Sequence, residues 1–245
     1  MAPSLHVRVA LGVKAPDGVS GFELDVEFEV PPGVTVLFGP SGAGKSRTLG
    51  CIAGIVRPSR GRIALGDEAW FDGKVTCPIH RRRAAYVFQS LALFPHMAAE
   101  YNVEYGIARD VPSHERRARA IKMLERMHVP HLVGRKPRTF SGGEAQRVAL
   151  ARAFAMHPRV LLLDEPFSAL DSKTKTALLA EARERIAEAK IPTILVTHDH
   201  GEARALGERV LFMELGRIIR TADVSDPALS SPKLVAAERA GEDRS

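Results

Sequence analysis

Residues 34–46 read VTVLFGPSGAGKS, and this stretch decides the fold. Its first five residues are apolar or β-branched, which predicts a buried strand. Residues 39–46 then match the pattern GxxxxGK[ST] at every fixed position, and residues 47–55 show helical periodicity. Backbone N–H groups of such a loop wrap phosphates, and the N-terminus of the following helix adds positive potential. The order of strand, loop and helix therefore predicts a phosphate-binding site in an α/β fold.

The side chains of this loop have separate expected roles. Lys45 is expected to reach the β- and γ-phosphates of a nucleotide, and the Ser46 hydroxyl is expected to ligate Mg²⁺. The alternative is a glycine-rich turn without a ligand, which the strand and helix on either side disfavour. The expected nucleotide-binding residues of this loop are Gly39, Pro40, Ser41, Gly42, Ala43, Gly44, Lys45, Ser46 and Arg47.

A second apolar run, residues 160–163, ends in the carboxylates Asp164 and Glu165. Ligands of α/β folds bind at the carboxyl ends of strands, so both side chains are expected at that edge. Asp164 suits Mg²⁺, directly or through water, and Glu165 is placed to act as general base on a water molecule or to orient it. The alternative is a strand end followed by a helix cap, which becomes the weaker interpretation beside a phosphate loop.

Residues 141–147 read SGGEAQR and precede the helical pattern of residues 148–156. A serine and two glycines at a helix N-terminus offer backbone donors to an anion, which indicates a second anion site. Physical chemistry alone favours a simpler interpretation, because Ser141 with Glu144 three residues on forms a capping box.

Together these stretches resemble the ATP-binding cassette (ABC) ATPases. Residues 141–146 are similar to the signature motif of that family, and its other motifs occur in family order. Gln89 in YVFQ resembles the glutamine of the Q-loop, residues 168–171 (SALD) resemble the D-loop, and His198 in THD resembles the switch histidine. The resemblance runs from about residue 20 to about residue 220. Several short motifs in one order are more specific than any one of them.

The resemblance implies a head-to-tail dimer in which the phosphate loop of one subunit and the signature motif of the other enclose ATP, with two ATP molecules per dimer. Gln89 would touch Mg²⁺ and the attacking water, and His198 would hold the γ-phosphate and Glu165. The implied catalytic residues are Glu165, His198 and Gln89, and the implied metal ligands are Ser46, Gln89 and Asp164. The implied nucleotide contacts outside the phosphate loop are Ser141, Gly142, Gly143, Glu144 and Asp171, the last facing the opposite subunit.

The same resemblance implies transmembrane permease subunits as direct partners and a substrate-binding protein as an indirect one. Apolar residues follow the Q-loop, namely Leu91, Leu93, Phe94 and Met97. They are either part of a groove that receives a short helix of the permease or the core of a small helical subdomain.

Finer similarities concern the transported substrate. Residues 61–63, 81–83, 93–96 and 171–176 resemble those of importers of oxyanions, above all molybdate and tungstate. Importers of sulfate, iron or polyamines share much of this sequence and stay as alternatives. A soluble ABC ATPase of translation or DNA repair is a further alternative, disfavoured because such relatives commonly carry two cassettes or a long coiled-coil insertion.

Three positions depart from the family pattern. Phe140 and Glu144 stand where the family usually has Leu and Gln, and a Glu is common in the molybdate branch. The aromatic residue that stacks on adenine in many members has no clear equivalent, and Phe22 is the nearest candidate.

The patterns predict an α/β fold with an N-terminal antiparallel β subdomain and an inserted α-helical subdomain, and the resemblance implies that its core is a P-loop NTPase (RecA-like) core. Residues 5–13 and 22–30 alternate in polarity, which indicates antiparallel strands, whereas the runs at 85–88, 160–163, 194–197 and 210–213 indicate buried strands. We expect one ABC ATPase domain over residues 1–245. Its parts are the core (1–88 and 141–225), the helical subdomain (89–140) and a C-terminal tail (226–245).

Composition narrows the class of protein. The chain has 245 residues, 45% hydrophobic and 26% charged, with a formal net charge of +6. It lacks a signal-peptide pattern and a run of about 18 apolar residues, so we expect it at the cytoplasmic side of the cell membrane, held there by its partners. The positive charge comes without a nucleic-acid-binding motif, so we expect no nucleic acid partner. Cys51 and Cys77 show no metal-ligand spacing and are expected to be reduced.

Overall fold

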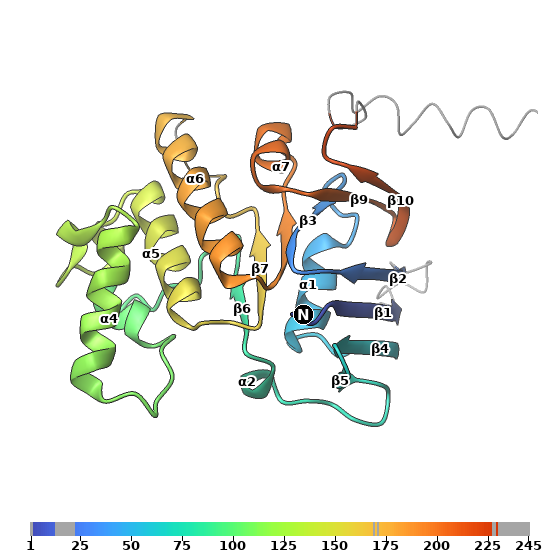
Figure 1. The fold of residues 1–245 in the computed structure, drawn as a ribbon, viewed down its shortest axis with the longest axis horizontal. Coiled ribbons are helices and arrows are strands. Elements are labelled where there is room, and N and C mark those ends of the chain that lie inside the picture. The colour runs from blue at the N-terminus through green and yellow to red at the C-terminus, as the bar shows by residue number, and fades with distance from the viewer. Residues whose placement is uncertain (1, 13–22, 169, 171, 227–228, 230–245) are drawn as a thin grey trace, which may run out of the picture.

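A computed structural model describes residues 2–12, 23–168, 170, 172–226 and 229, and shows two β-sheets with helices packed beside them (Figure 1). One sheet has the strand order β2-β1-β4-β5 and the other has the order β10-β9-β3-β8-β7-β6. The predicted α/β class, with an antiparallel N-terminal part and inserted helices, is confirmed. The subdomain boundaries proposed from the sequence stay predictions.

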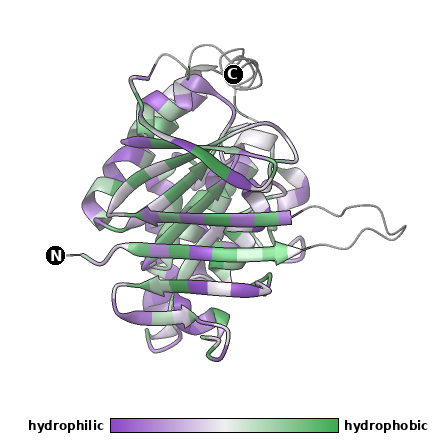
Figure 2. Ribbon diagram, turned by 90° about the vertical axis from the view of Figure 1, so that its right-hand side faces the viewer, coloured by the Kyte–Doolittle hydropathy of each residue, from purple (hydrophilic) through white to green (hydrophobic). Residues whose placement is uncertain are grey.

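The four-stranded sheet is antiparallel and consists of β1 (Leu5–Gly12), β2 (Glu23–Val30), β4 (Arg60–Leu65) and β5 (Glu68–Phe71). Side chains at alternate positions of β1, such as Val7 and Val9, are buried in a core shared with α1 (Lys45–Ala53). Hydrophobic and hydrophilic residues alternate along these strands in Figure 2. Because side chains at alternate positions point to opposite faces of the sheet, one face packs on the core and the other faces solvent.

The sequence did not predict β4 or β5. The first half of β4 carries exposed Arg60 and Arg62, which hide its strand character. Gly61 between them has φ of 120°, and a Cβ atom there would lie 2.0 Å from the carbonyl oxygen of Arg8. A glycine is therefore required for β4 to approach β1 this closely.

The six-stranded sheet positions the candidate site. Its strands are β3 (Gly33–Phe38), β6 (Ala84–Val87), β7 (Val160–Asp164), β8 (Pro192–Val196), β9 (Arg209–Glu214) and β10 (Arg217–Asp223). The pairs β3–β8, β8–β7, β7–β6 and β3–β9 are parallel, and β10 is antiparallel to β9. Every residue of β7 and β8 is buried, as expected for central strands of a parallel sheet. The carboxyl ends of β3, β6, β7 and β8 consequently meet at one edge.

Helices α4 (Ser113–Arg126) and α5 (Gly142–Ala155) lie to one side of the parallel sheet in Figure 1. Helix α3 (Ala99–Glu104) packs against both of them, and they pack against each other. Short 3₁₀ turns at Pro130–Leu132 and Pro137–Thr139 join α4 to α5. Helix α5 also contacts β6, so it links the inserted helices to the sheet. The remaining helices are α2 (Ile79–Arg82), α6 (Ser172–Ala189) and α7 (His200–Leu206).

A buried arginine joins the end of α1 to the antiparallel sheet. Arg82 is 1% exposed, whereas its neighbours Arg81 and Arg83 are exposed. Its guanidinium donates to the carbonyl oxygens of Cys51, Ile52, Trp70 and Cys77 at 2.7 to 3.2 Å. The carbonyls of Cys51 and Ile52 belong to the last turn of α1, where a helix has no internal donors. Arg82 therefore satisfies backbone acceptors that water cannot reach.

We predict that Arg82→Met lowers the free energy of unfolding by about 3 kcal/mol, because four carbonyl groups lose a hydrogen bond at once, although those of Cys51 and Trp70 keep a backbone donor. Burial lowers the pKa of Arg82, so removing its charge recovers some desolvation energy without restoring those hydrogen bonds. Urea denaturation measures the difference. Exposed Arg81→Met is the matched control and should stay within about 0.5 kcal/mol of the parent. Equal stability of the two variants would contradict this role of Arg82.

Candidate functional site

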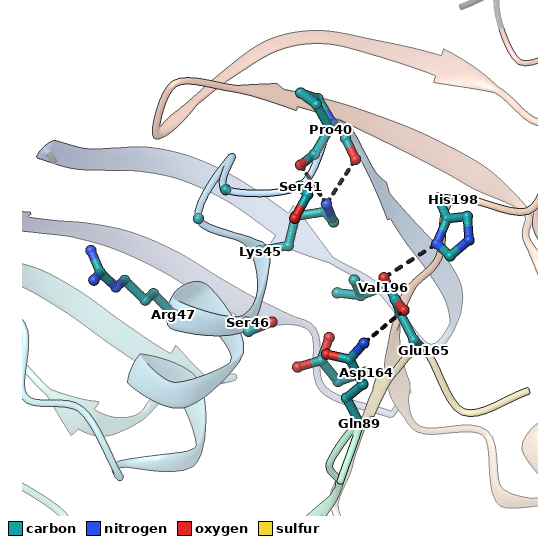
Figure 3. A pocket seen from close by; sticks show the side chains of 13 residues that line it. Pro40, Ser41, Lys45, Ser46, Arg47, Gln89, Asp164, Glu165, Val196 and His198 are labelled. Carbon is teal, nitrogen blue, oxygen red and sulfur yellow. Dashed lines mark hydrogen bonds and ion pairs between the residues drawn. The ribbon is translucent and has the colours of Figure 1, made fainter. Parts of the chain in front are cut away.

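A cavity of about 710 Å³ lies at the carboxyl edge of the parallel sheet (Figure 3). It collects segments that follow four different strands, as the topology requires. Its lining consists of Gly39, Pro40, Ser41, Gly42, Gly44, Lys45, Ser46, Arg47, Gln89, Asp164, Glu165, Val196 and His198. The sequence-predicted residues of the phosphate loop, the Q-loop, the β7 carboxylates and the switch histidine are thus brought together. Ala43 is the exception within the loop, because it is buried beneath it.

The phosphate loop folds around the amino group of Lys45. Lys45 Nζ donates to the carbonyl oxygens of Gly39 and Pro40, both at 2.7 Å (Figure 3). The side chain is 8% exposed, and burial lowers the pKa of Lys45 although Glu165 and Asp164 act to raise it. A buried cation whose hydrogen bonds go to neutral carbonyl groups is stabilised strongly when an anion enters the cavity.

The backbone of the loop depends on its glycines. Gly42 and Gly44 have φ of 82° and 104°, in the left-handed region where other residues are strained. Gly44 is also the N-cap of α1, so no side chain caps the first turn of that helix and its N–H groups point toward the cavity edge. A Cβ atom on Gly39 would lie 2.1 Å from the carbonyl oxygen of Met213. The loop is therefore a fixed cradle with backbone donors.

Asp164 lies deep in the cavity and is 5% exposed. Burial raises the pKa of Asp164, and hydrogen bonds from the hydroxyls of Ser46 and Tyr86 oppose that rise. The Tyr86 hydroxyl is 3.1 Å from Asp164 Oδ2, and burial next to this carboxylate raises the pKa of the tyrosine. Sequence reasoning missed Tyr86. Its position on β6, three residues before Gln89, was the available signal.

Glu165 receives one contact from each of two other segments. Gln89 Nε2 donates to Glu165 Oε2 at 3.1 Å, and His198 Nδ1 lies 3.2 Å from Glu165 Oε1 (Figure 3). The backbone N–H of Glu165 donates to the carbonyl oxygen of Val196 at 3.0 Å. Glu165 has φ of 49°, which is strained for a residue with a side chain. Such strain concentrates at functional sites, and here it aims the carboxylate into the cavity.

The SGGE segment lies elsewhere. Within the described part of the chain, residues 141–144 are absent from the cavity lining and instead form the N-terminus of α5. Ser141 and Glu144 make the expected capping box, with Ser141 N donating to Glu144 Oε2 at 2.7 Å. The ring of His131 lies 2.7 Å from Glu144 Oε1. Contacts with His131 and the Ser141 N–H lower the pKa of Glu144 to about 2, so this carboxylate is ionised and locked onto its own helix.

Two further residues of interest cannot be placed. Asp171 and Phe22 lie outside the described residues. Leu170 is described and lies beside the SGGE segment, since a Cβ atom on Gly143 would be 2.9 Å from Leu170 Cδ2. The start of the D-loop segment therefore contacts the SGGE segment of the same chain.

The fold and the site define a P-loop nucleotide-binding protein, because a phosphate cradle, oxygen ligands suited to Mg²⁺ and an oriented carboxylate share one cavity. The family model described as "ABC transporter" matches residues 24–168. The chain belongs to the ABC transporter family.

Curated relatives narrow this class. The chain is 45% identical over 200 residues to the "Molybdenum import ATP-binding protein ModC" of Methylococcus capsulatus, covering 81% of this chain and 56% of that protein. It is 38% identical over 226 residues to the ModC of Pseudomonas fluorescens, covering 91% and 61%. It is 46% identical over 209 residues to the "Molybdate/tungstate import ATP-binding protein WtpC" of Archaeoglobus fulgidus, covering 85% of each. The chain thus spans little more than half the length of the two ModC relatives and most of the length of WtpC.

Solved structures give the same fold. The ATP-binding cassette MJ0796, described as dimeric and in one structure as a post-hydrolysis state bound to ADP and Pi, aligns with a TM-score of 0.80 at 29% identity. The alignment covers 91% of this chain and 99% of that one. No helix in the described ranges has the length and apolar composition needed to cross a bilayer.

Proposed function

We propose that this chain binds and hydrolyses ATP and thereby energises an ABC importer of an oxyanion, with molybdate or tungstate as the best-supported substrate. The observation that carries the ATPase proposal is the position of Glu165, held by Gln89 and His198 in a cavity whose opposite wall is the phosphate loop. A site for binding alone needs the loop but has no use for a strained, oriented carboxylate.

The residues present fit a triphosphate and its metal ion. Backbone donors, Lys45 and the uncapped N-terminus of α1 suit phosphate groups. The Ser46 hydroxyl, the Asp164 carboxylate and the Gln89 amide oxygen are hard oxygen ligands, which Mg²⁺ prefers. A Mg²⁺ ion held by these groups would supply charge neutralisation of the phosphates and polarisation of the bond to the terminal phosphate. Tyr86, through its hydrogen bond, fixes the carboxylate of Asp164 for that role.

Glu165 then accepts a proton from the attacking water, or at least orients it, because its carboxylate is aimed into the cavity. His198 contacts Glu165 and is placed to donate to the terminal phosphate as negative charge builds there. Gln89 connects the Glu165 carboxylate to the segment that leads into the helical part of the chain. A movement of the helical part would therefore move Gln89 relative to Glu165. Arg47 at the rim adds positive charge.

The SGGE segment completes the site from a second copy. Residues 141–144 lie outside their own cavity, yet offer a serine and two glycines at a helix N-terminus. A head-to-tail pair would bring Ser141, Gly142 and Gly143 to the terminal phosphate of the partner copy, while Glu144 holds the helix end rigid. Asp171 follows Leu170 in the chain and is proposed to contact the opposite copy.

The transported substrate is inferred from the relatives. ModC and WtpC proteins are named for import of molybdenum and of molybdate or tungstate. Sulfate, iron and polyamine importers are the alternatives, because substrate choice rests with the binding protein and the permease. Through permease subunits the chain would work at the cytoplasmic side of the cell membrane.

A groove of about 690 Å³ on the helical part suits the permease contact. Its walls include Met97, Tyr101 and Tyr105, and the two tyrosines are 47% and 61% exposed. Phe94 packs beneath Tyr105 with ring centroids 4.6 Å apart. Of the four apolar residues after the Q-loop, Leu91 and Leu93 pack against the main core, whereas Met97 lines this groove. We propose that a short helix of the permease docks here, with the tyrosines as its apolar contacts.

We predict that Lys45→Ala and Glu165→Gln fail differently. Lys45→Ala weakens ATP binding, because the buried cation of the phosphate cradle is removed. Glu165→Gln keeps binding within a few-fold and lowers kcat by about 100-fold or more, because the base is lost. Nucleotide titration and phosphate release measure both. Glu27→Gln, on the exposed face of the antiparallel sheet, is the control. A Glu165→Gln variant that hydrolyses ATP at the parental rate would refute the assignment.

We predict that Tyr105→Glu abolishes uptake by the complex reconstituted with its permease. Basal ATPase activity of the separate chain should stay within about twofold of the parent, because the catalytic residues lie on the sheet edge and not on α3. Ile219→Glu is the matched control, since Ile219 is 44% exposed on β10 at the far edge of the sheet. Uptake of radiolabelled molybdate and circular dichroism are the measurements. Normal uptake by a folded Tyr105→Glu variant would exclude this groove as the docking surface.

A further inference from the structure

A partly buried ionic network lies next to the switch histidine, with the Asp199 side chain 40% exposed. Lys175 on α6 contacts two carboxylates of the segment around α7: its Nζ atom is 2.6 Å from Asp199 Oδ2 and 2.5 Å from Glu202 Oε1. The Glu202 side chain is 3% exposed and Lys175 is 20% exposed. Burial acts to lower the pKa of Lys175, but the hydrogen bonds to Asp199 and Glu202 outweigh it and raise the pKa, so the lysine stays charged.

The network encloses both backbone neighbours of His198. On one side, the Thr197 hydroxyl donates to Glu202 Oε2 at 2.6 Å in a fully buried bond. On the other side, the Asp199 N–H donates to that hydroxyl at 3.0 Å, and Asp199 Oδ1 accepts from the Glu202 N–H at 3.0 Å. Thr197, Asp199 and Lys175 therefore each contact Glu202 directly.

His198 itself has little packing to hold it, because its side chain is 69% exposed. Its distance of 3.2 Å from Glu165 must therefore be set by the backbone on either side. Lys175 connects that backbone to α6, which begins at Ser172, soon after the segment that starts at Glu165. One lysine thus joins the chain segments that carry the two members of the Glu165–His198 pair.

We propose that Lys175 is a positioning residue for ATP hydrolysis: it holds the His198 segment against the segment that follows Glu165, and so keeps His198 in register with Glu165 and the terminal phosphate. The inference rests on the proposed ATPase function and adds a residue that touches neither nucleotide nor metal.

A purely structural ion pair on the same helix offers a comparison. Arg185 of α6 is 17% exposed and contacts the two carboxylates Glu181 and Glu188. Those partners are on α6 itself, so within the described part of the chain the ion pairs of this arginine join α6 to no other element. Arg185→Met therefore removes a cation with two carboxylate partners from α6 and leaves the His198 segment untouched.

The experiment compares Lys175→Met, Lys175→Arg and Arg185→Met in the full chain. We expect Lys175→Met to lower kcat about tenfold while KM for ATP changes less than about twofold, because ligand contacts persist and the alignment needed for the reaction is lost. Lys175→Arg restores at least half of kcat, since arginine can reach both carboxylates. In a His198→Ala background, Lys175→Met should have no further effect on kcat, because it acts through His198.

Hydrogen exchange gives a readout that needs no catalysis. The amides of residues 197–203 should exchange faster in Lys175→Met than in the parent or in Arg185→Met. If Lys175→Met changes neither amide exchange nor kcat, the inference is overturned. It is also overturned if Arg185→Met loses as much kcat as Lys175→Met, or if Lys175→Met loses as much kcat in the His198→Ala background as in the parent. A parent chain without ATPase activity would instead refute the proposed function, and the exchange comparison would still decide whether Lys175 holds this segment.

Discussion

Parallel pairing of β3, β8, β7 and β6 is the constraint on which the rest of the structure depends. It places the ends of four strands at one sheet edge, and each strand delivers a different group there: the phosphate loop, the Glu165 carboxylate, His198 and Gln89. Residues separated by more than 150 positions then contact one another without any local signal between them. The buried aliphatic residues of β7 and β8 keep this edge rigid, so the strain at Glu165 is supported by the core rather than by a ligand.

The same geometry leaves the site one-sided. Lys45, Ser46 and Asp164 line the cavity that is proposed to hold phosphate and metal, whereas the SGGE segment on α5 lies outside that cavity. We propose a second copy as the source of donors on the other side, because α5 is packed against α3, α4 and β6 with its N-terminus outside its own cavity. In the proposed dimer, binding of ATP and association of two chains would be one event, and Gln89, which contacts Glu165, would pass its outcome to the helices that carry the proposed permease groove.

The sequence predicted those parts of the fold and the site that show a short-range sequence pattern. The strand, loop and helix at residues 34–55, the aliphatic strand before Asp164 and the Ser141 capping box each follow from spacing alone. It could not predict β4, whose polar residues face solvent, or the burial of Arg82, which looks like its exposed neighbours. Nor could it find Lys175, because the lysine meets Asp199 across 24 positions and only the fold shows that contact. The proposed roles of Asp171 and Phe22 stay predictions from the sequence.

The central claim is that ATP completes a site shared by two copies of this chain. Sedimentation velocity of Glu165→Gln, in saturating ATP without Mg²⁺ and in the absence of nucleotide, tests it most directly. We expect a monomer without nucleotide and a dimer with ATP, because Ser141 and Gly143 of one copy are proposed to reach the phosphates bound by the other. Adding Ser141→Arg to the same chain should return it to monomer in ATP. A Glu165→Gln chain that binds ATP and stays monomeric at every protein concentration would refute the shared site.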